Sequence, residues 1–286
     1  MTWPTRIGMP GGIRTALDES AARWSVDQLA RPEVQRRALE DAGRNVAGLR
    51  DLLGEVTETV HRSGAVLVAG FPHGSSALVV FAAALGEVNA TYNGPAPGRL
   101  VHDLVAAAGA DYQKADPPHN DSVFIERPHA FIGLLCIRPS GRQDGLTELI
   151  RAADVVDALR ERGADLEALQ DPCFPFAEPE PKDPSAGPPA VHLRPVLSGE
   201  GTGATVLWRP TRVRAGLRLR PDALDARHRA ALAAFEAVLT EPGLATRVLL
   251  GASDLLLLDN RRALHGRTPV APGGNDRHLK RVKVHA

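Results

Sequence analysis

Residues 254–270 read DLLLLDNRRALHGRTPV and form the most distinctive segment of the chain. Four consecutive leucines between two aspartates predict a short buried strand, because uninterrupted apolar runs of this length are typical of strands covered on both faces. Asp259 and Asn260 favour a turn directly after that strand. The chain that leaves the turn carries His265, which we consider first as a candidate metal ligand.

A second histidine stands next to a carboxylate in ADPPHNDSVF, residues 115–124. His119 and Asp121 form the one His-x-Asp or His-x-Glu triplet in the sequence. On an extended segment, residues i and i+2 face the same side, so both side chains can reach one metal ion. Two histidines and one carboxylate make the facial triad of non-haem Fe(II) oxygenases. Such a triplet also arises by chance, and taken singly each residue is equally compatible with a turn, a cap or the core.

The remaining segments predict helices around a β-rich middle. Apolar periodicity and end signals indicate helices over 32–63, 75–86, 147–163 and 221–243. Short apolar runs predict strands over 65–71, 130–139, 190–197, 204–210, 246–251, 254–260 and 278–286. We therefore expect one α+β domain over residues 1–286, with a helical N-terminal part over 1–63 and sheets folded into a sandwich or barrel. Residues 174–189, rich in proline and charge, predict a surface loop or lid.

The composition excludes several classes of function. The chain has 286 residues, of which 43% are hydrophobic and 24% are charged, with a formal net charge of zero. This balance gives no reason to expect a nucleic-acid or membrane partner, and no apolar run approaches the roughly 20 residues of a membrane span. The first residues lack the pattern of a signal peptide. Because Cys136 and Cys173 cannot build a disulfide framework, we expect a reducing cytoplasm. The oligomeric state stays open.

The order of motifs resembles the Fe(II)/2-oxoglutarate-dependent dioxygenases of the taurine dioxygenase and clavaminate synthase-like group. The resemblance begins near Val60, runs to the C-terminus, and is carried by VLVAGFP (66–72), LVHDL (100–104), HND (119–121), RPHAFIGLLCIRP (127–139), GLT (145–147), DLLLLDNRRALHGRTP (254–269) and DRHLKR (276–281). It implies a double-stranded β-helix, or jelly roll, with helices outside. It also implies that His119, Asp121 and His265 hold Fe(II), with 2-oxoglutarate and O₂ as co-substrates.

The resemblance assigns roles to further residues. Arg277 matches the arginine that pairs with the C5 carboxylate of 2-oxoglutarate, and Thr147 matches a hydroxyl that shares this carboxylate. Thr147 is also well placed to cap the predicted helix over 147–163, and both roles can coexist. Arg281 matches a position that often holds a substrate acid group. Because residues i and i+4 of a strand share a face, Arg277 and Arg281 should point the same way.

The segment VLWRPTRVRAG, residues 206–216, bears on the substrate. Related enzymes that act on basic amino acids tend to carry acidic residues here, whereas this chain carries Arg209, Arg212 and Arg214. If these arginines face the pocket, with Arg209 as a substrate contact, they favour an anionic or neutral substrate side chain. The alternative is that they face solvent.

We therefore expect hydroxylation of an unactivated C–H bond in a small carboxylate-bearing substrate, an amino acid or derivative from secondary metabolism such as antibiotic biosynthesis. Desaturation or cyclisation would use the same ligands. Halogenation is disfavoured, because halogenases of the group lack the carboxylate ligand that Asp121 supplies here. A non-catalytic binding jelly roll and a cupin-type hydrolytic or isomerising metalloenzyme are the alternatives from other classes. Neither of them explains Thr147 and Arg277.

Overall fold

A computed structural model describes residues 3–90, 98–105, 114–142, 144–181, 185, 187–271 and 277–286. Its helices are α1 (Gly11–Ala21), α2 (Pro32–Asn45), α3 (Leu49–Ser63), α4 (Ser75–Ala82), α5 (Ala152–Glu161), α6 (Leu166–Gln170), α7 (Pro210–Leu219) and α8 (Ala226–Leu239). Its strands are β1 (Thr5–Gly8), β2 (Ala65–Ala69), β3 (Glu87–Asn89), β4 (His102–Val105), β5 (Asp116–His119), β6 (Phe131–Arg138), β7 (Thr147–Arg151), β8 (Phe174–Ala177), β9 (Val191–Arg194), β10 (Leu197–Ser198), β11 (Thr205–Val206), β12 (Thr246–Val248), β13 (Asp254–Asp259), β14 (Ala263–Arg267) and β15 (His278–His285). Single 3₁₀ turns are η1 (Gln28–Ala30), η2 (Ala83–Leu85) and η6 (Gly201–Gly203).

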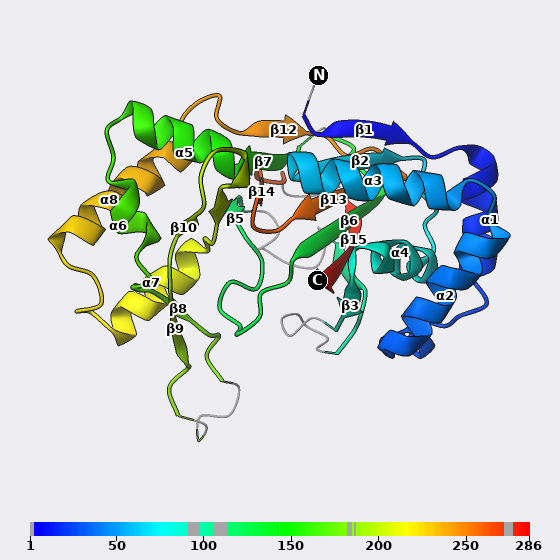
Figure 1. Cartoon of the computed structure of the whole chain (residues 1–286), viewed down its shortest axis with the longest axis horizontal. Helices are drawn as coiled ribbons and strands as arrows, with labels where there is room; N and C mark the ends of the chain where they lie inside the picture. Colours follow the sequence, from blue (N-terminus) through cyan, green and yellow to red (C-terminus); the bar gives the residue numbers. More distant parts are fainter. Residues whose placement is uncertain are drawn as a thin grey trace.

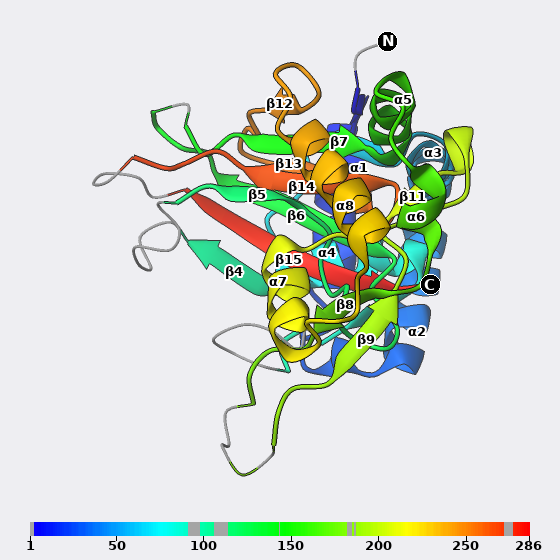
Figure 2. The same ribbon diagram turned by 90° about the vertical axis from the view of Figure 1, so that its left-hand side faces the viewer.

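Two main sheets form the centre of the molecule. The larger has seven strands in the order β1-β2-β13-β6-β15-β3, with β4 also paired to β15. The smaller has four strands in the order β12-β7-β14-β5. In Figure 1, α1–α4 lie on one side of these strands and α5–α8 on the other. In Figure 2, β15 runs between β6 and β4, two of the three strands with which it pairs antiparallel, the third being β3. The core is the expected jelly roll with flanking helices.

The four leucines of β13 show why this strand is apolar throughout. Leu255 and Leu257 pack with the N-terminal helices on the outer face of the larger sheet. Leu256 and Leu258 point the other way, into a cluster that includes Leu149 of the smaller sheet. A strand buried on both faces needs apolar residues at every position, not at alternate ones.

A third apolar cluster covers the outer face of the smaller sheet. Ile150 of β7 and Leu264 of β14 pack there against Val155 of α5 and Phe235 of α8. The neighbours of these strand residues in sequence, Leu149 and Ala263, belong to the cluster between the sheets. Strand alternation therefore assigns each residue of β7 and β14 either to the helix-covered outer face or to the space between the sheets, where the candidate site lies.

Several predicted boundaries differ from the structure. The helix predicted over 32–63 is two helices, α2 and α3, separated where Gly48 adopts the left-handed conformation with φ of +78°. The predicted helical N-terminal part also contains β1, which pairs in parallel with β2. The predicted helix over 221–243 begins only at Ala226, with the Asp225 side chain accepting from the His228 N–H. Such a cap satisfies a backbone donor that the helix start would otherwise leave unpaired.

Two further corrections concern segments that bear on the site. The helix predicted over 147–163 starts five residues late, because Thr147–Arg151 pairs with β14 and β12 as strand β7. Thr147 is therefore not a helix cap. The predicted loop over 174–189 begins with a buried strand, since Phe174–Ala177 pairs with β9. Residues 182–184 and 186 of that segment lie outside the described residues. The strand predicted over 204–210 shortens to β11, because Pro210 opens α7.

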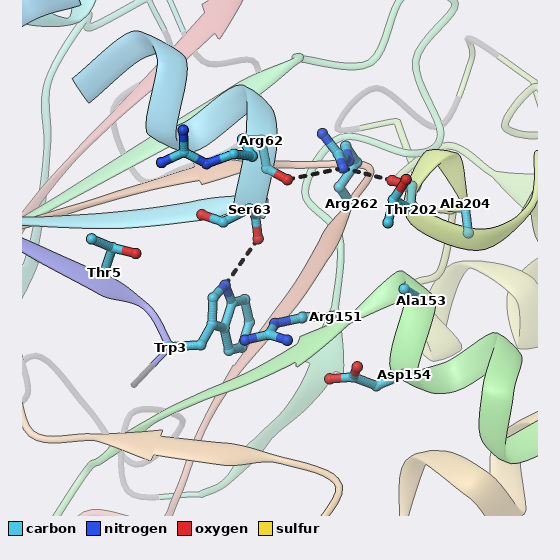
Figure 3. Close-up of a pocket in the computed structure, with 10 residues that line it drawn as sticks. All are labelled: Trp3, Thr5, Arg62, Ser63, Arg151, Ala153, Asp154, Thr202, Ala204 and Arg262. Carbon is cyan, nitrogen blue, oxygen red and sulfur yellow. Dashed lines mark hydrogen bonds between the residues drawn. The ribbon is translucent and has the colours of Figure 1, made fainter. Parts of the chain in front are cut away.

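The N-terminal segment packs against the end of α3 and against Arg151. The Trp3 indole N–H donates to the Ser63 carbonyl, and the Arg151 guanidinium lies 4.7 Å from the centre of the Trp3 ring. Figure 3 shows these side chains around a pocket between the end of α3, the β13–β14 turn and the start of α5. The pocket contains none of the predicted site residues. Among the residues that the structure describes, no helix combines the length and apolar character needed to cross a bilayer.

Candidate active site

The candidate metal ligands His119, Asp121 and His265 come together between the sheets. His265 of β14 and His119 at the end of β5 are partners in an antiparallel pair, and their ring centroids are 4.4 Å apart. The Nε2 atom of His119 lies 3.6 Å from Oδ1 of Asp121. One ligand atom from each of the three side chains lies within 4.8 Å of the other two, and all three residues are buried. The geometry thus joins residues far apart in sequence.

Two asparagines fix the backbone around these side chains. Asn120 donates to the carbonyls of Asn260 and Ala263, and its own carbonyl oxygen accepts from the Trp208 N–H. Asn260 accepts from the Asp121 N–H and donates to the carbonyls of Asp121 and His129. Both asparagines are fully buried, so the bonds are shielded from water. The β13–β14 turn is therefore tied to the His119–Asp121 segment by these hydrogen bonds.

The hydrogen bonds of His119 define which nitrogen is available. Its Nδ1 lies 2.9 Å from the Pro117 carbonyl, which can only accept, so Nδ1 donates to it and Nε2 is the nitrogen that faces Asp121. Burial lowers the pKa of His265 well below its ordinary value and keeps this imidazole neutral. Its Nδ1 is buried and has no hydrogen-bond partner among the described residues. Two imidazoles beside a carboxylate fit a divalent transition metal.

Asp121 is held by two cations. Arg281 Nη1 lies 3.0 Å from Oδ2 of Asp121, and Lys283 Nζ lies 3.2 Å from the same oxygen. Burial by itself would raise the pKa of Asp121, but the two cations outweigh it and hold that pKa well below the ordinary value. The Arg281 guanidinium donates to Oδ2, whereas Oδ1 is the oxygen that faces Nε2 of His119. The carboxylate is therefore ionised and oriented.

Sequence reasoning missed Lys283. The chain has only four lysines against 30 arginines, and Lys283 stands between Val282 and Val284, two positions after Arg281. Strand alternation puts Lys283 on the same face as Arg281. A lysine on the predicted inner face of a strand is costly to bury without a partner, and this signal was available in the sequence.

Arg277 is buried just before β15. A methyl group at Gly145 would meet Val270 Cγ2 at 2.7 Å and Arg277 Cδ at 3.3 Å, so the Arg277 stem packs tightly on the loop before β7. Burial lowers the pKa of Arg277 to about 10, an effect that nearby Arg267 reinforces, yet the group stays charged at neutral pH. Thr147 is buried two residues after Gly145 and pairs with Arg267 across β7 and β14. Arg277 and Thr147 thus border the same part of the space between the sheets.

The three arginines of 206–216 occupy different environments. Arg209 Nη1 lies 3.4 Å from Asp116 Oδ1, next to His119. The Arg212 guanidinium lies over the Phe124 ring at 4.8 Å. Arg214 is 67% exposed and pairs with Glu236 on the surface. Arg209 is therefore the one of the three that adjoins the candidate metal ligands, and the solvent-facing alternative holds for Arg214.

Comparison with known proteins gives consistent matches. Residues 33–283 match the model of the family described as "Taurine catabolism dioxygenase TauD, TfdA family". The L-asparagine oxygenase of Streptomyces coelicolor is 30% identical over 221 residues, an alignment that covers 74% of this chain but only 61% of that protein. A structure of asparagine oxygenase with Fe(II), 2S,3S-3-hydroxyasparagine and succinate superposes with a TM-score of 0.71 at 23% identity, over 98% of this chain and 93% of that one. The non-heme iron oxygenase OrfP with Fe and alpha-ketoglutaric acid gives 0.70 at 20% identity, over 98% and 94%.

Proposed function

Because the chain belongs to the TauD, TfdA dioxygenase family, we propose that it is an Fe(II)- and 2-oxoglutarate-dependent oxygenase that hydroxylates an unactivated C–H bond of a small amino acid or derivative. The observation that carries the proposal is the convergence of His119, Asp121 and His265 on one point between the sheets. When bound there, iron supplies the redox chemistry that couples decarboxylation of 2-oxoglutarate to oxidation of the substrate. The protein supplies the positions of the reactants.

Each residue of the site has a distinct part in this proposal. His119, oriented by its Pro117 hydrogen bond, and His265, kept neutral by burial, present imidazole nitrogens to the metal. Asp121 contributes one negative charge to it. Arg277 offers a buried guanidinium for the C5 carboxylate of 2-oxoglutarate, a pairing that can be bidentate, and the Thr147 hydroxyl adds a donor. The apolar residues between the sheets, such as Leu134 and Leu256, exclude water around these polar groups.

The charges around the site favour a substrate with a carboxylate. Apart from Arg277, which we assign to 2-oxoglutarate, Arg209, Arg281 and Lys283 bring three positive charges, and Asp116 and Asp121 bring two negative ones. The surplus of one positive charge in a largely buried space attracts an anionic group. Arg281 has the planar donor fork that suits a substrate carboxylate. The solved relatives were bound to hydroxylated asparagine and hydroxylated arginine, which supports an amino acid here.

Hydroxylation is the outcome we propose, with desaturation and cyclisation as variants that differ only in substrate placement. A non-catalytic jelly roll would have no reason to bury Arg277 and Thr147 beside an intact ligand set. We further propose that the enzyme works in the cytoplasm, where its two free cysteines stay reduced, and serves a biosynthetic route such as that to an antibiotic.

The test is succinate release from 2-oxoglutarate by the Fe(II)-loaded protein with ascorbate, against a panel of acidic, neutral and basic amino acids. We expect one class of amino acid to stimulate succinate release and to gain one oxygen atom, detected by mass spectrometry. Gain of a hydroxyl identifies hydroxylation, and loss of two hydrogens identifies desaturation or cyclisation. The proposed activity would be contradicted if the protein bound Fe(II) but released no succinate, either with the amino acids of the panel or in the absence of a substrate.

A further inference from the structure

Two cations from one strand share a single oxygen of Asp121. Arg281 and Lys283 lie at alternate positions of β15 and so face the same side, toward the candidate metal ligands. Their nitrogens are 3.0 Å and 3.2 Å from Oδ2. One carboxylate neutralises only one of them. A second buried cation at this point is costly unless it has a task, because burying a charge is unfavourable without full compensation.

The surroundings of the two cations differ. The Lys283 side chain is 3% exposed, and its Nζ also donates to the Ser122 hydroxyl at 3.1 Å. Ser122 is itself held by the His129 ring at 2.8 Å, and the His129 carbonyl accepts from Asn260. Lys283 is thus part of the rigid network that fixes the backbone of Asp121.

Arg281 is attached more loosely. Its side chain is 17% exposed, and Asp121 is its one hydrogen-bond partner among the residues that the structure describes. Its Nε is buried without a partner there. Arg281 therefore retains unused donors, whereas the contacts of Lys283 are all to the fixed framework.

We propose that Lys283 is the positioning residue of the metal site. Held by the Ser122–His129 network, Lys283 fixes Oδ2 of Asp121, and Arg281 is therefore available to bind a substrate carboxylate. This inference rests on the proposed function and adds to the site a residue that is not itself a metal ligand. The division of labour suits the two side chains. Lysine is a compact point charge that satisfies one oxygen, whereas the planar fork of arginine matches an incoming carboxylate.

Metal affinity tests the proposal without turnover. Co(II), whose visible spectrum reports its coordination, is titrated into metal-free full-length protein, and the affinity is measured by calorimetry. Groups that orient a ligand from behind typically change metal affinity by about 10–100-fold, and we expect a loss of that size for Lys283→Met. Lys283→Arg should recover part of it. Lys280→Met is the matched control, because Lys280 lies on the opposite face of β15 and donates to Ser75.

The comparison with Arg281 decides the division of labour. Arg281→Met should bind Co(II) much more tightly than Lys283→Met, because Lys283 keeps Asp121 in place. Thermal unfolding of the metal-free variants separates lost positioning from lost folding. If Lys283→Met fails to fold, Ser122→Gly serves instead. Ser122 has φ of +60°, which glycine adopts freely, so this change removes the hydroxyl without backbone strain. It should weaken Co(II) binding in the same direction.

The outcomes separate this inference from the proposed function. Wild-type protein that binds no Co(II) contradicts the metal site and with it both proposals. Wild-type protein that binds Co(II), with Lys283→Met equal to Lys280→Met, overturns the role of Lys283 alone. Arg281→Met losing as much affinity as Lys283→Met overturns it too. If Lys283→Met does not fold, wild-type Co(II) affinity in Ser122→Gly likewise overturns the role of Lys283.

Discussion

His265 lies directly opposite His119 in the antiparallel pair of β14 and β5. The two histidines are distant in sequence, and the hydrogen-bonded register of the strands makes them neighbours. Asp121 follows His119 by two residues and is brought to the same point by its bonds to Asn260. The site is therefore built on rigid sheet, which is the arrangement that holds ligands most precisely.

We expect His119→Ala, Asp121→Ala and His265→Ala each to abolish Fe(II) binding and turnover, because each removes one of three donors. The measurement is anaerobic Fe(II) calorimetry together with succinate release. His192→Ala is the control, since His192 pairs with Glu178 on the β8–β9 ribbon. A His265→Ala protein with wild-type activity would show that the triad is wrongly assigned.

Arg277→Ala should raise the KM for 2-oxoglutarate by two to three orders of magnitude, because losing one partner of a buried ion pair costs about 3–5 kcal/mol. Arg277→Lys should recover only part, since lysine lacks the planar fork. Thr147→Val should act in the same direction by about 1 kcal/mol, the value of one hydrogen bond. Initial rates at varied 2-oxoglutarate measure all three, and an unchanged KM in Arg277→Ala would remove Arg277 from the site.

Gly145→Ala should also raise the KM for 2-oxoglutarate. Gly145 has φ of +59°, and an added methyl group would meet Val270 Cγ2 at 2.7 Å and the Arg277 stem at 3.3 Å. We expect Arg277 to be displaced and the free energy of unfolding to fall by about 1–2 kcal/mol from the left-handed backbone alone. Gly141→Ala is the control, because its methyl group meets nothing within 4 Å. A lower stability with an unchanged KM would separate Gly145 from Arg277.

Sequence patterns predicted the buried strands well. Runs such as FIGLLCIR in β6 are apolar because one set of side chains packs under the N-terminal helices and the other packs between the two sheets. They failed where pairing with distant chain decides the structure. Thr5–Gly8 buries only Ile7 and becomes a strand through β2. Thr147 is in a strand because β14 and β12 pair with it, although its local sequence favours a helix start. For the site, the ligand spacing was visible, but the pairing of Lys283 with Asp121 depends on how β15 faces β5.

The stability of the protein should fall as the pH is lowered below about 6.5, in part through His129. Burial lowers the pKa of His129 to about 3, so the unfolded chain binds a proton that the folded protein excludes. This contribution is complete above the unfolded pKa and is lost progressively between pH 6.5 and 3. From pH 7 to 5.5 it amounts to about 1 kcal/mol. Urea unfolding at pH 7 and pH 5.5 measures this change, and the free energy of unfolding should decrease less between the two pH values in His129→Gln than in the wild-type protein.

His228 provides a control of opposite sign for that experiment. Its pKa is raised, chiefly by the hydrogen bond to Asp171 and also by Asp225, so its contribution is present at low pH and is lost as the pH rises through the folded pKa. His228→Gln should therefore make the loss of stability on acidification steeper. If His129→Gln kept the full wild-type pH dependence, other histidines whose pKa burial lowers, such as His102 and His265, would have to account for it.

Arg209 should set the preference for substrate charge. It adjoins the metal ligands through Asp116 and is 28% exposed, so its charge is only partly screened. Arg209→Ala removes the surplus positive charge around the site, and we expect the ratio of kcat/KM for neutral or acidic amino acids to that for basic ones to fall about tenfold, equivalent to about 1.4 kcal/mol. The measurement is the substrate panel read by succinate release. Arg214→Ala is the matched control, because this surface arginine pairs with Glu236 and should leave the ratio unchanged. A wild-type enzyme that prefers arginine or lysine would contradict the charge argument, since a site with surplus positive charge repels a cationic side chain.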